Sequence, residues 1–186
     1  SDKLIEDGRM TVASYLRDRG YFTACVGKWH LGMTWPRRGP GPEDVDFSRP
    51  IVGGPTSVGF DYYFGISASL DMPPYVYIEN DRATAEPDHE TANDEEKAFW
   101  RAGPTAPDFR HEEVLPRCSE NVCRIIAAQA AAKKPFFIYF PLPAPHTPIL
   151  PLPEYQGKSG TNEYGDFVLQ VDAVVGKHGL LLLRLR

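Results

Sequence analysis

Two short apolar runs, residues 21–26 and 136–140, constrain the fold of this chain more than any other feature. Neither alternates with polar residues, which is typical of strands covered on both faces. Helical spacing of apolar residues precedes each run, at 10–19 and again from Ser119, which we expect to be the N-cap of its helix. Helices that alternate with buried strands predict an α/β fold with a mostly parallel sheet flanked by helices.

The rest of the chain is predicted to be one domain with an insertion and an unusual end. Residues 163–175 have a helical apolar face, and we assign 1–176 to the domain. Residues 72–113 are expected to form an insertion or lid loop, because their acidic stretch has no clear period. Two histidines of this segment, His89 and His111, are expected to be solvated. The tail, 177–186, loses the amphipathic pattern and reads like a frameshifted end.

Composition and charge exclude several classes of protein. Hydrophobic residues make up 42% and charged residues 24% of the chain, as is ordinary for a soluble globular domain. A net charge of −5 argues against a general nucleic-acid binder. No apolar run is long enough to span a membrane. Three irregularly spaced cysteines predict neither a disulfide framework nor a zinc site, and Cys25 is expected to be a buried hydrophobe.

A lysine and a histidine follow the first predicted strand. Lys28 and His30 are two residues apart, so in an extended chain their side chains would point the same way. An ammonium beside an imidazole suits a small oxyanion, because the first supplies a point charge and the second a donor that can change protonation. The spacing alone fits a surface lysine and a half-buried structural histidine better.

A second histidine, His146, follows the second predicted strand. The carboxyl ends of parallel strands meet at one edge of the sheet, where such folds bind ligands. Prolines on both sides stiffen the loop, which suits a catalytic group and a structural histidine equally well. Ser69 and Asp71 follow the aromatic cluster at 60–66 and either line this site or turn the chain. No metal-ligand spacing and no phosphate loop appears in the sequence.

Residues 20–32 read Gly-Tyr-Phe-Thr-Ala-Cys-Val-Gly-Lys-Trp-His-Leu-Gly. This run matches every fixed position of a signature of the sulfatase family, Gly-Tyr-x-Thr-x-x-x-Gly-Lys-Trp-His-Leu-Gly. Segments 59–66 and 135–151 resemble two further family segments, in family order. The chain is therefore similar to the arylsulfatase-like branch of the alkaline-phosphatase superfamily over roughly 4–176. The resemblance implies part of an alkaline-phosphatase-like sandwich, incomplete in this chain.

The resemblance also implies a reaction and its residues. Sulfatases hydrolyse sulfuric esters with a formylglycine nucleophile, made from Cys or Ser, and a divalent cation, usually calcium. Lys28 would contact the sulfate and the leaving-group side, and His30 would bond the formylglycine hydroxyl. His146 would contact the sulfate ester and protonate the leaving oxygen, and Ser69 matches a polar residue near the nucleophile. The partner would be a sulfated small molecule or glycan, and the full-length parent would be periplasmic or secreted.

Several parts of the family pattern are missing from this sequence. No Cys-x-Pro-x-Arg precedes Gly20, and neither the early aspartate pair nor the later Asp-Asn pair that bind the metal can be matched. We therefore expect half of an anion site, no metal ligands and no turnover by this chain alone. One alternative is a non-catalytic module that binds an oxyanion or a sulfated glycan. A related phosphoesterase is another, disfavoured by the intact Gly-Lys-Trp-His-Leu-Gly.

Overall fold

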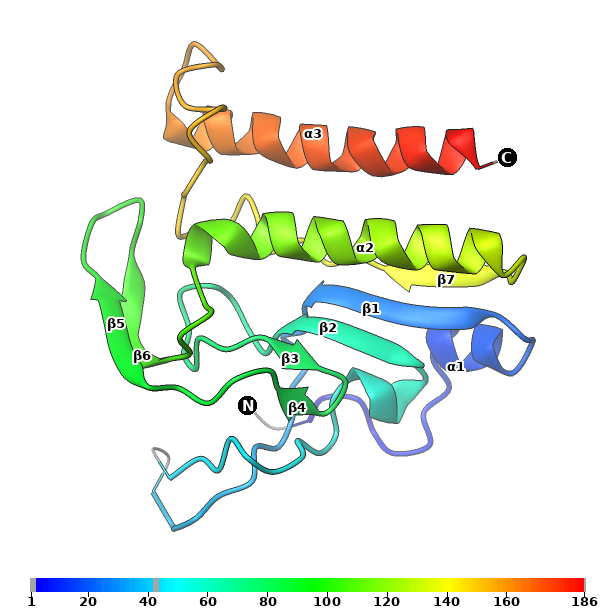
Figure 1. Ribbon diagram of the computed structural model, residues 1–186. Helices are drawn as coiled ribbons and strands as arrows, with labels where there is room; N and C mark the ends of the chain where they lie inside the picture. Colours follow the sequence, from blue (N-terminus) through cyan, green and yellow to red (C-terminus); the bar gives the residue numbers. More distant parts are fainter. Residues whose placement is uncertain (1–2, 42–43, 186) are drawn as a thin grey trace.

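The computed structural model describes residues 3–41 and 44–185, which form a five-stranded sheet, a separate hairpin and three α-helices (Figure 1). The sheet contains β1 (Phe22–Lys28), β2 (Tyr62–Ile66), β3 (Ile78–Glu79), β4 (Arg82–Ala83) and β7 (Phe136–Tyr139). The hairpin pairs β5 (His89–Asn93) with β6 (Trp100–Thr105). The helices are α1 (Val12–Arg17), α2 (Val114–Ala131) and α3 (Glu163–Arg184), with 3-10 turns η1 (Pro55–Val58) and η2 (His111–Glu113).

The strand order is β4-β3-β2-β1-β7, and the three longest strands of the sheet run parallel. Ala24 of β1 lies opposite Tyr62 of β2 on one side and Ile138 of β7 on the other. The two-residue strands β3 and β4 are added antiparallel. The predicted α/β class is confirmed, and the sheet is mixed because β3 runs opposite to the other strands.

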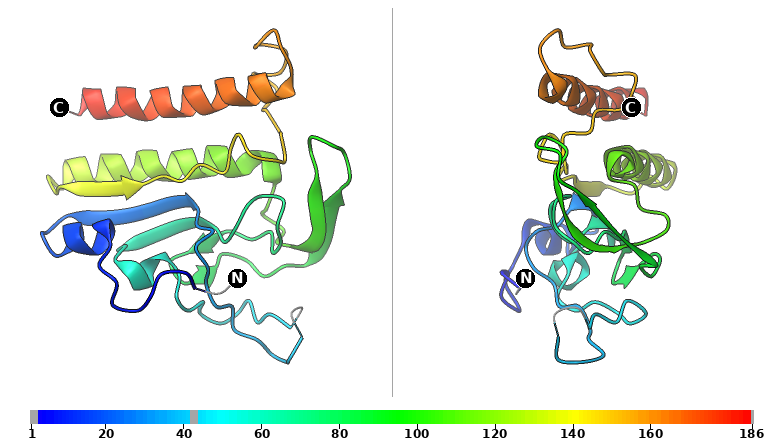
Figure 2. Two further views of the ribbon diagram at one scale, coloured as in Figure 1. Left: turned by 180° about the vertical axis from the view of Figure 1, so that it is seen from behind. Right: turned by 90° about the vertical axis from the view of Figure 1, so that its left-hand side faces the viewer.

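The core lies on both faces of β1. Ala24, Cys25 and Val26 have no exposed surface, so side chains of both faces are covered, and the expected burial of Cys25 is confirmed. Figure 2 shows α1 and α2 on opposite faces of the sheet, with α3 lying outside α2. A strand enclosed by helices on both faces requires the continuous apolar run that residues 21–26 show.

Helix α2 begins earlier than its apolar pattern suggests. We expected Ser119 to cap it, but the helix starts at Val114, directly after η2, and Ser119 lies inside it with 2% of its surface exposed. Pro116 fits the first turn, where a backbone N–H has no helical partner and its loss costs nothing. The N-cap prediction was therefore wrong.

Strand β7 is less buried than expected. Its side chains are half-buried, and Tyr139 has 43% of its surface exposed. The described sheet ends at β7, which pairs only with β1 there. An edge strand lacks a neighbour on one side, so an apolar run alone does not guarantee complete burial.

Helix α3 extends well beyond the predicted end at residue 175 and finishes at Arg184. Most of the tail is thus helical. His178 is 8% exposed, and its Nε2 lies 3.1 Å from the hydroxyl of Ser119 in α2. Leu180 and Leu183 remain 59% and 64% exposed. Among residues 3–41 and 44–185, no helix combines the length and the apolar character that crossing a membrane requires.

The segment 72–113 has more regular structure than a loop. It contains β3, β4 and the β5–β6 hairpin. His111 was expected to be solvated, but it is 6% exposed, and its ring stacks on Trp100 with centroids 4.0 Å apart. That prediction was wrong because the hairpin brings an aromatic side chain over a histidine that is distant in sequence. His89 is exposed, as expected.

Candidate functional site

Strand β1 ends at Lys28, and the chain turns sharply after it. The backbone N–H of Lys28 donates to the carbonyl of Pro141, in the loop after β7, at 2.9 Å. His30 has φ of +55°, and its N–H donates to the carbonyl of Ser67, in the loop after β2, at 3.0 Å. The chain is therefore not extended through this motif, and the simple alternation that we expected for the two side chains does not apply.

The residues around Lys28 explain why the motif contains glycine and tryptophan. Gly27 has φ of +126°, and a Cβ there would lie 2.2 Å from the carbonyl oxygen of Pro141. Trp29 is 4% exposed, packs edge-on against Phe60 and donates its indole N–H to the carbonyl of Gly32 at 2.9 Å. Glycine thus permits the close approach of the β7 loop, and the buried indole anchors the turn.

Ser69 contacts His30 directly. The Ser69 hydroxyl is 3.3 Å from Nδ1 of His30, although the residues are 39 positions apart. Ser69 is 4% exposed, whereas His30 is exposed. A fixed hydroxyl therefore orients one side of an imidazole whose other side is open to solvent.

His146 is exposed on the loop after β7. Its Nδ1 lies 2.7 Å from the carbonyl oxygen of Thr147. A carbonyl only accepts hydrogen bonds, so Nδ1 carries the proton and Nε2 is the nitrogen left for other contacts. The same loop contacts the end of β1 through Pro141 and Lys28.

Charged groups at the ends of three strands act on His30. The pKa of His30 is lowered, first by partial burial and then by the positive charges of Lys28 and His146, while the carboxylate of Asp71 raises it. The predicted residues Lys28, His30, Ser69 and His146 therefore come together at the carboxyl ends of β1, β2 and β7. Asp71, which the sequence left as a turn or a lining residue, belongs to the same cluster.

No group of three His, Cys, Asp or Glu side chains that could hold calcium is found in the described ranges. Sulfatases generally use calcium and formylglycine, but in 3–41 and 44–185 no three His, Cys, Asp or Glu side chains are grouped to hold a metal ion. These residues do not fit the cation. Cys25 and Cys118 are buried, which raises the pKa of both thiols, that of Cys118 to about 12, so neither is an accessible nucleophile.

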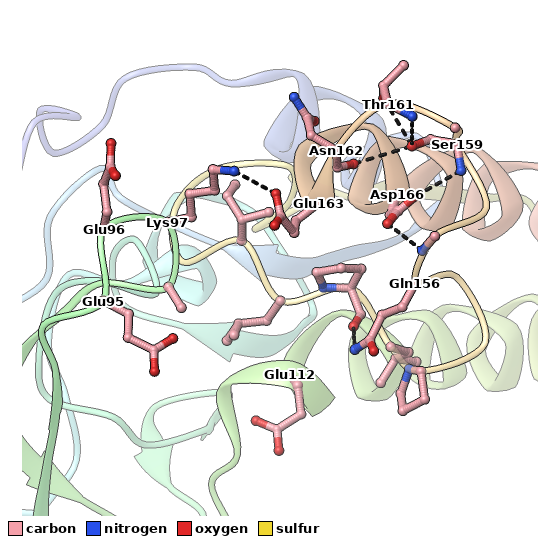
Figure 3. Close-up of a pocket in the computed structure, with 18 residues that line it drawn as sticks. Glu95, Glu96, Lys97, Glu112, Gln156, Ser159, Thr161, Asn162, Glu163 and Asp166 are labelled. Carbon is pink, nitrogen blue, oxygen red and sulfur yellow. Dashed lines mark hydrogen bonds and ion pairs between the residues drawn. The ribbon is translucent and has the colours of Figure 1, made fainter.

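A large cavity of about 1140 Å³ lies elsewhere, between residues 95–98, residues 149–153 and the start of α3 (Figure 3). Its acidic lining residues are Glu95, Glu96, Glu112, Glu163 and Asp166. Lys97 is paired with Glu163 at 2.6 Å. None of the clustered residues at the strand ends lines this cavity, and its negative lining does not suit a sulfate.

A mostly parallel sheet flanked by helices, with a lysine and two histidines near the carboxyl ends of its parallel strands, is an α/β fold whose ligands are expected at that edge. The family model described as Sulfatase matches residues 3–178. This chain belongs to the sulfatase family.

Relatives support the same assignment. The chain is 32% identical to the N-acetylgalactosamine-6-O-sulfatase of Bacteroides thetaiotaomicron over 95% of its own length and 40% of the relative's. It is 29% identical to the N-acetylgalactosamine-6-sulfatase of Canis lupus familiaris, covering 98% of this chain and 31% of that protein. The chain thus spans less than half the length of these relatives.

Solved structures agree with the fold. A solved structure from work on the metabolism of multiple glycosaminoglycans by Bacteroides thetaiotaomicron matches this chain with a TM-score of 0.79 and 28% identity. The match covers 100% of this chain and 44% of that one. The PsFucS1 sulfatase from Pseudoalteromonas sp. matches with a TM-score of 0.63 and 18% identity, over 98% and 38%. The second likeness concerns the fold alone.

Proposed function

We propose that this chain carries the anion-binding part of a sulfuric ester hydrolase site, in which Lys28, His30, His146 and Ser69 hold the sulfate ester. The observation that supports it is the convergence of these residues, from three separate loops, at one edge of the sheet. The cluster carries positive charge from Lys28 and contains two imidazoles that can donate hydrogen bonds. Such a group stabilises the negative charge of a sulfate and of a departing oxygen.

Each residue has a separate role in the proposal. Lys28 is half-buried and contributes a point charge toward the sulfate oxygens. His146 has Nδ1 bound to a carbonyl, so a protonated ring can give its Nε2 proton to the leaving oxygen. The lowered pKa of His30 favours the neutral ring, which can accept or donate one hydrogen bond at the nucleophile.

The nucleophile and the metal are not attributed to this sequence. When present in a sulfatase, formylglycine supplies the attacking hydroxyl and calcium polarises the sulfate. No Cys-x-Pro-x-Arg segment occurs in the chain, and its described residues offer no grouped metal donors. The activity of a complete sulfatase would therefore need residues in addition to these.

We propose a sulfated glycan as the substrate class. The two relatives compared above are named for N-acetylgalactosamine 6-sulfate. A sulfated hexosamine consists of a compact sulfate group and a neutral sugar. Because His30 and His146 are exposed, such a ligand can reach both side chains from solvent. Such substrates are extracellular, so a periplasmic or secreted parent protein fits the proposal.

Binding of sulfated sugar tests the anion site. We expect the chain to bind N-acetylgalactosamine 6-sulfate, and Lys28→Ala to weaken that binding by about tenfold or more, which corresponds to one lost charge-assisted contact. Isothermal titration calorimetry at low salt measures both. Lys134→Ala is the matched control, because Lys134 is exposed before β7, at the opposite end of the strands. Equal affinities for the two variants would contradict the proposal.

Turnover tests the missing half of the site. We expect no hydrolysis of a chromogenic aryl sulfate by this chain above the uncatalysed rate, with or without calcium, because the sequence has no formylglycine motif. The measurement is absorbance of the released phenol, with a complete sulfatase as positive control. Robust turnover that Lys28→Ala abolishes would overturn this expectation and show that another residue supplies the nucleophile.

A further inference from the structure

Asp71 has an unusual carboxylate. It lies two residues after Ser69, and only 14% of its side chain is exposed. Arg101 donates to Oδ2, whereas Oδ1 is buried with no hydrogen-bond partner among the described residues. A buried acceptor without a hydrogen-bond partner costs free energy, so the presence of this carboxylate oxygen calls for an explanation beyond packing.

Arg101 connects this carboxylate to a distant element. It belongs to β6, in the hairpin of segment 72–113. Its guanidinium also donates to the main-chain carbonyl of Asp71 at 3.0 Å, and its backbone N–H donates to the same carbonyl at 3.3 Å. The Arg101 carbonyl accepts the hydroxyl proton of Tyr75 at 2.7 Å. Asp71 is thus held in one position by several contacts from a single residue.

The position of Asp71 matters for His30. Ser69 places its hydroxyl 3.3 Å from Nδ1 of His30, and the N–H of Met72 donates to the Ser69 carbonyl at 3.0 Å, which closes the turn that carries Asp71. Lys28 and His146 approach the same ring with positive charge. Among the described groups that act on this imidazole, Asp71 supplies the negative charge.

We propose that Asp71 and Arg101 are a positioning pair for His30. The unpaired Asp71 oxygen offsets the positive charges around the imidazole, and the positive charge of Arg101 limits the size of this effect on His30. The proposal rests on the proposed function, since it assigns the pair to the anion site. Neither residue contacts the substrate in this arrangement. Both act through His30, which stays able to take up a proton when an anion binds.

A purely structural role is the alternative, in which the ion pair only fastens the hairpin to the turn after β2. The two explanations differ in the sign of their effects. If the pair acts electrostatically, Asp71→Asn removes a negative charge and lowers the pKa of His30, whereas Arg101→Met removes a positive charge and raises it. We expect opposite shifts of about 0.3–1 unit. If the ion pair is only a tether, the pKa of His30 shifts in the same direction in both variants or stays unchanged in both.

The experiment is an NMR pH titration of the His30 ring protons in the intact chain, with the resonance assigned from His30→Gln. Arg101→Lys keeps the charge and should restore the original value. Arg17→Met is the matched control, because Arg17 lies on α1, outside this cluster, and should leave the titration unchanged. If Asp71→Asn fails to fold, Arg101→Met is compared with Arg101→Lys. A higher pKa of His30 in Arg101→Met, together with the original pKa in Arg101→Lys, supports the positioning role.

Shifts of the same sign in the two variants, or no shift in either, would overturn the positioning role. The titration needs no ligand, so its result is independent of sulfate binding. Opposite shifts in the pKa of His30, without any binding of sulfated sugar, would support the positioning pair and reject the proposed function. Binding that depends on Lys28, without opposite shifts, would retain the function and reject the pair.

Discussion

Replacing Gly27 by alanine is expected to destabilise the chain by about 3 kcal/mol or more, because strain and overpacking act together. The backbone at Gly27 has φ of +126°, which L side chains rarely adopt. The added Cβ would also meet the carbonyl oxygen of Pro141 at 2.2 Å, and neither atom is on a flexible side chain. The midpoint of urea unfolding followed by circular dichroism measures the change.

Gly176→Ala is the matched control for this prediction. Gly176 lies in α3, and no atom lies within 4 Å of the Cβ that alanine would add. There the substitution should stabilise the helix by about 0.5–1 kcal/mol, because glycine loses more backbone entropy on folding. Similar unfolding midpoints for Gly27→Ala and the wild type would show that the β1 end and the Pro141 loop do not approach as described.

Acid is expected to destabilise the fold through His111. Burial lowers the pKa of His111 from 6.5 to about 4, so the ring is neutral in the folded chain while the unfolded chain takes up a proton. The unfolded state therefore binds more protons between these values, and stability is lost as pH falls from about 6.5 toward 4. The loss approaches about 3 kcal/mol, at 1.36 kcal/mol per unit of pKa difference.

Replacing His111 isolates this contribution. His111→Phe keeps an aromatic ring against Trp100 and removes the buried Nε2, which has no partner among the described residues. We expect the unfolding free energy of this variant to fall much less between pH 6.5 and 4. The control is His89→Gln, because His89 is exposed and its ring nitrogen Nδ1 lies 2.6 Å from the neighbouring Asp88 carboxylate. A pH profile of His111→Phe that parallels the wild type would contradict the assignment.

Much of the fold could be predicted from local pattern. The run at 21–26 predicted β1, because a strand covered on both faces must be apolar on both faces. The apolar stripe from Val122 to Ala130 predicted the body of α2, although not its beginning. The start was missed because it depends on η2, whose His111 packs against the hairpin, and no short-range pattern reports that contact.

The candidate site divides in the same way. Lys28 and His30 could be found from one motif, since they are neighbours at the end of one strand. Their partners could not be placed from spacing alone: Ser69 is brought to His30 across 39 residues, and Arg101 to Asp71 across 30. The role of Arg101 could not be predicted, because this residue lies in a segment whose polar composition predicted a loop.

The sequence by itself determined the family and the class of fold, because the motif at 20–32 and the apolar strand inside it are local patterns. The glycine and tryptophan of that motif have local steric and packing reasons. Only the tertiary structure decided which charges surround His30, that His111 is buried and that the tail continues α3 with His178 against Ser119. These features depend on contacts between residues far apart in the chain. Burial and electrostatic shifts are properties of such contacts and follow from no single segment.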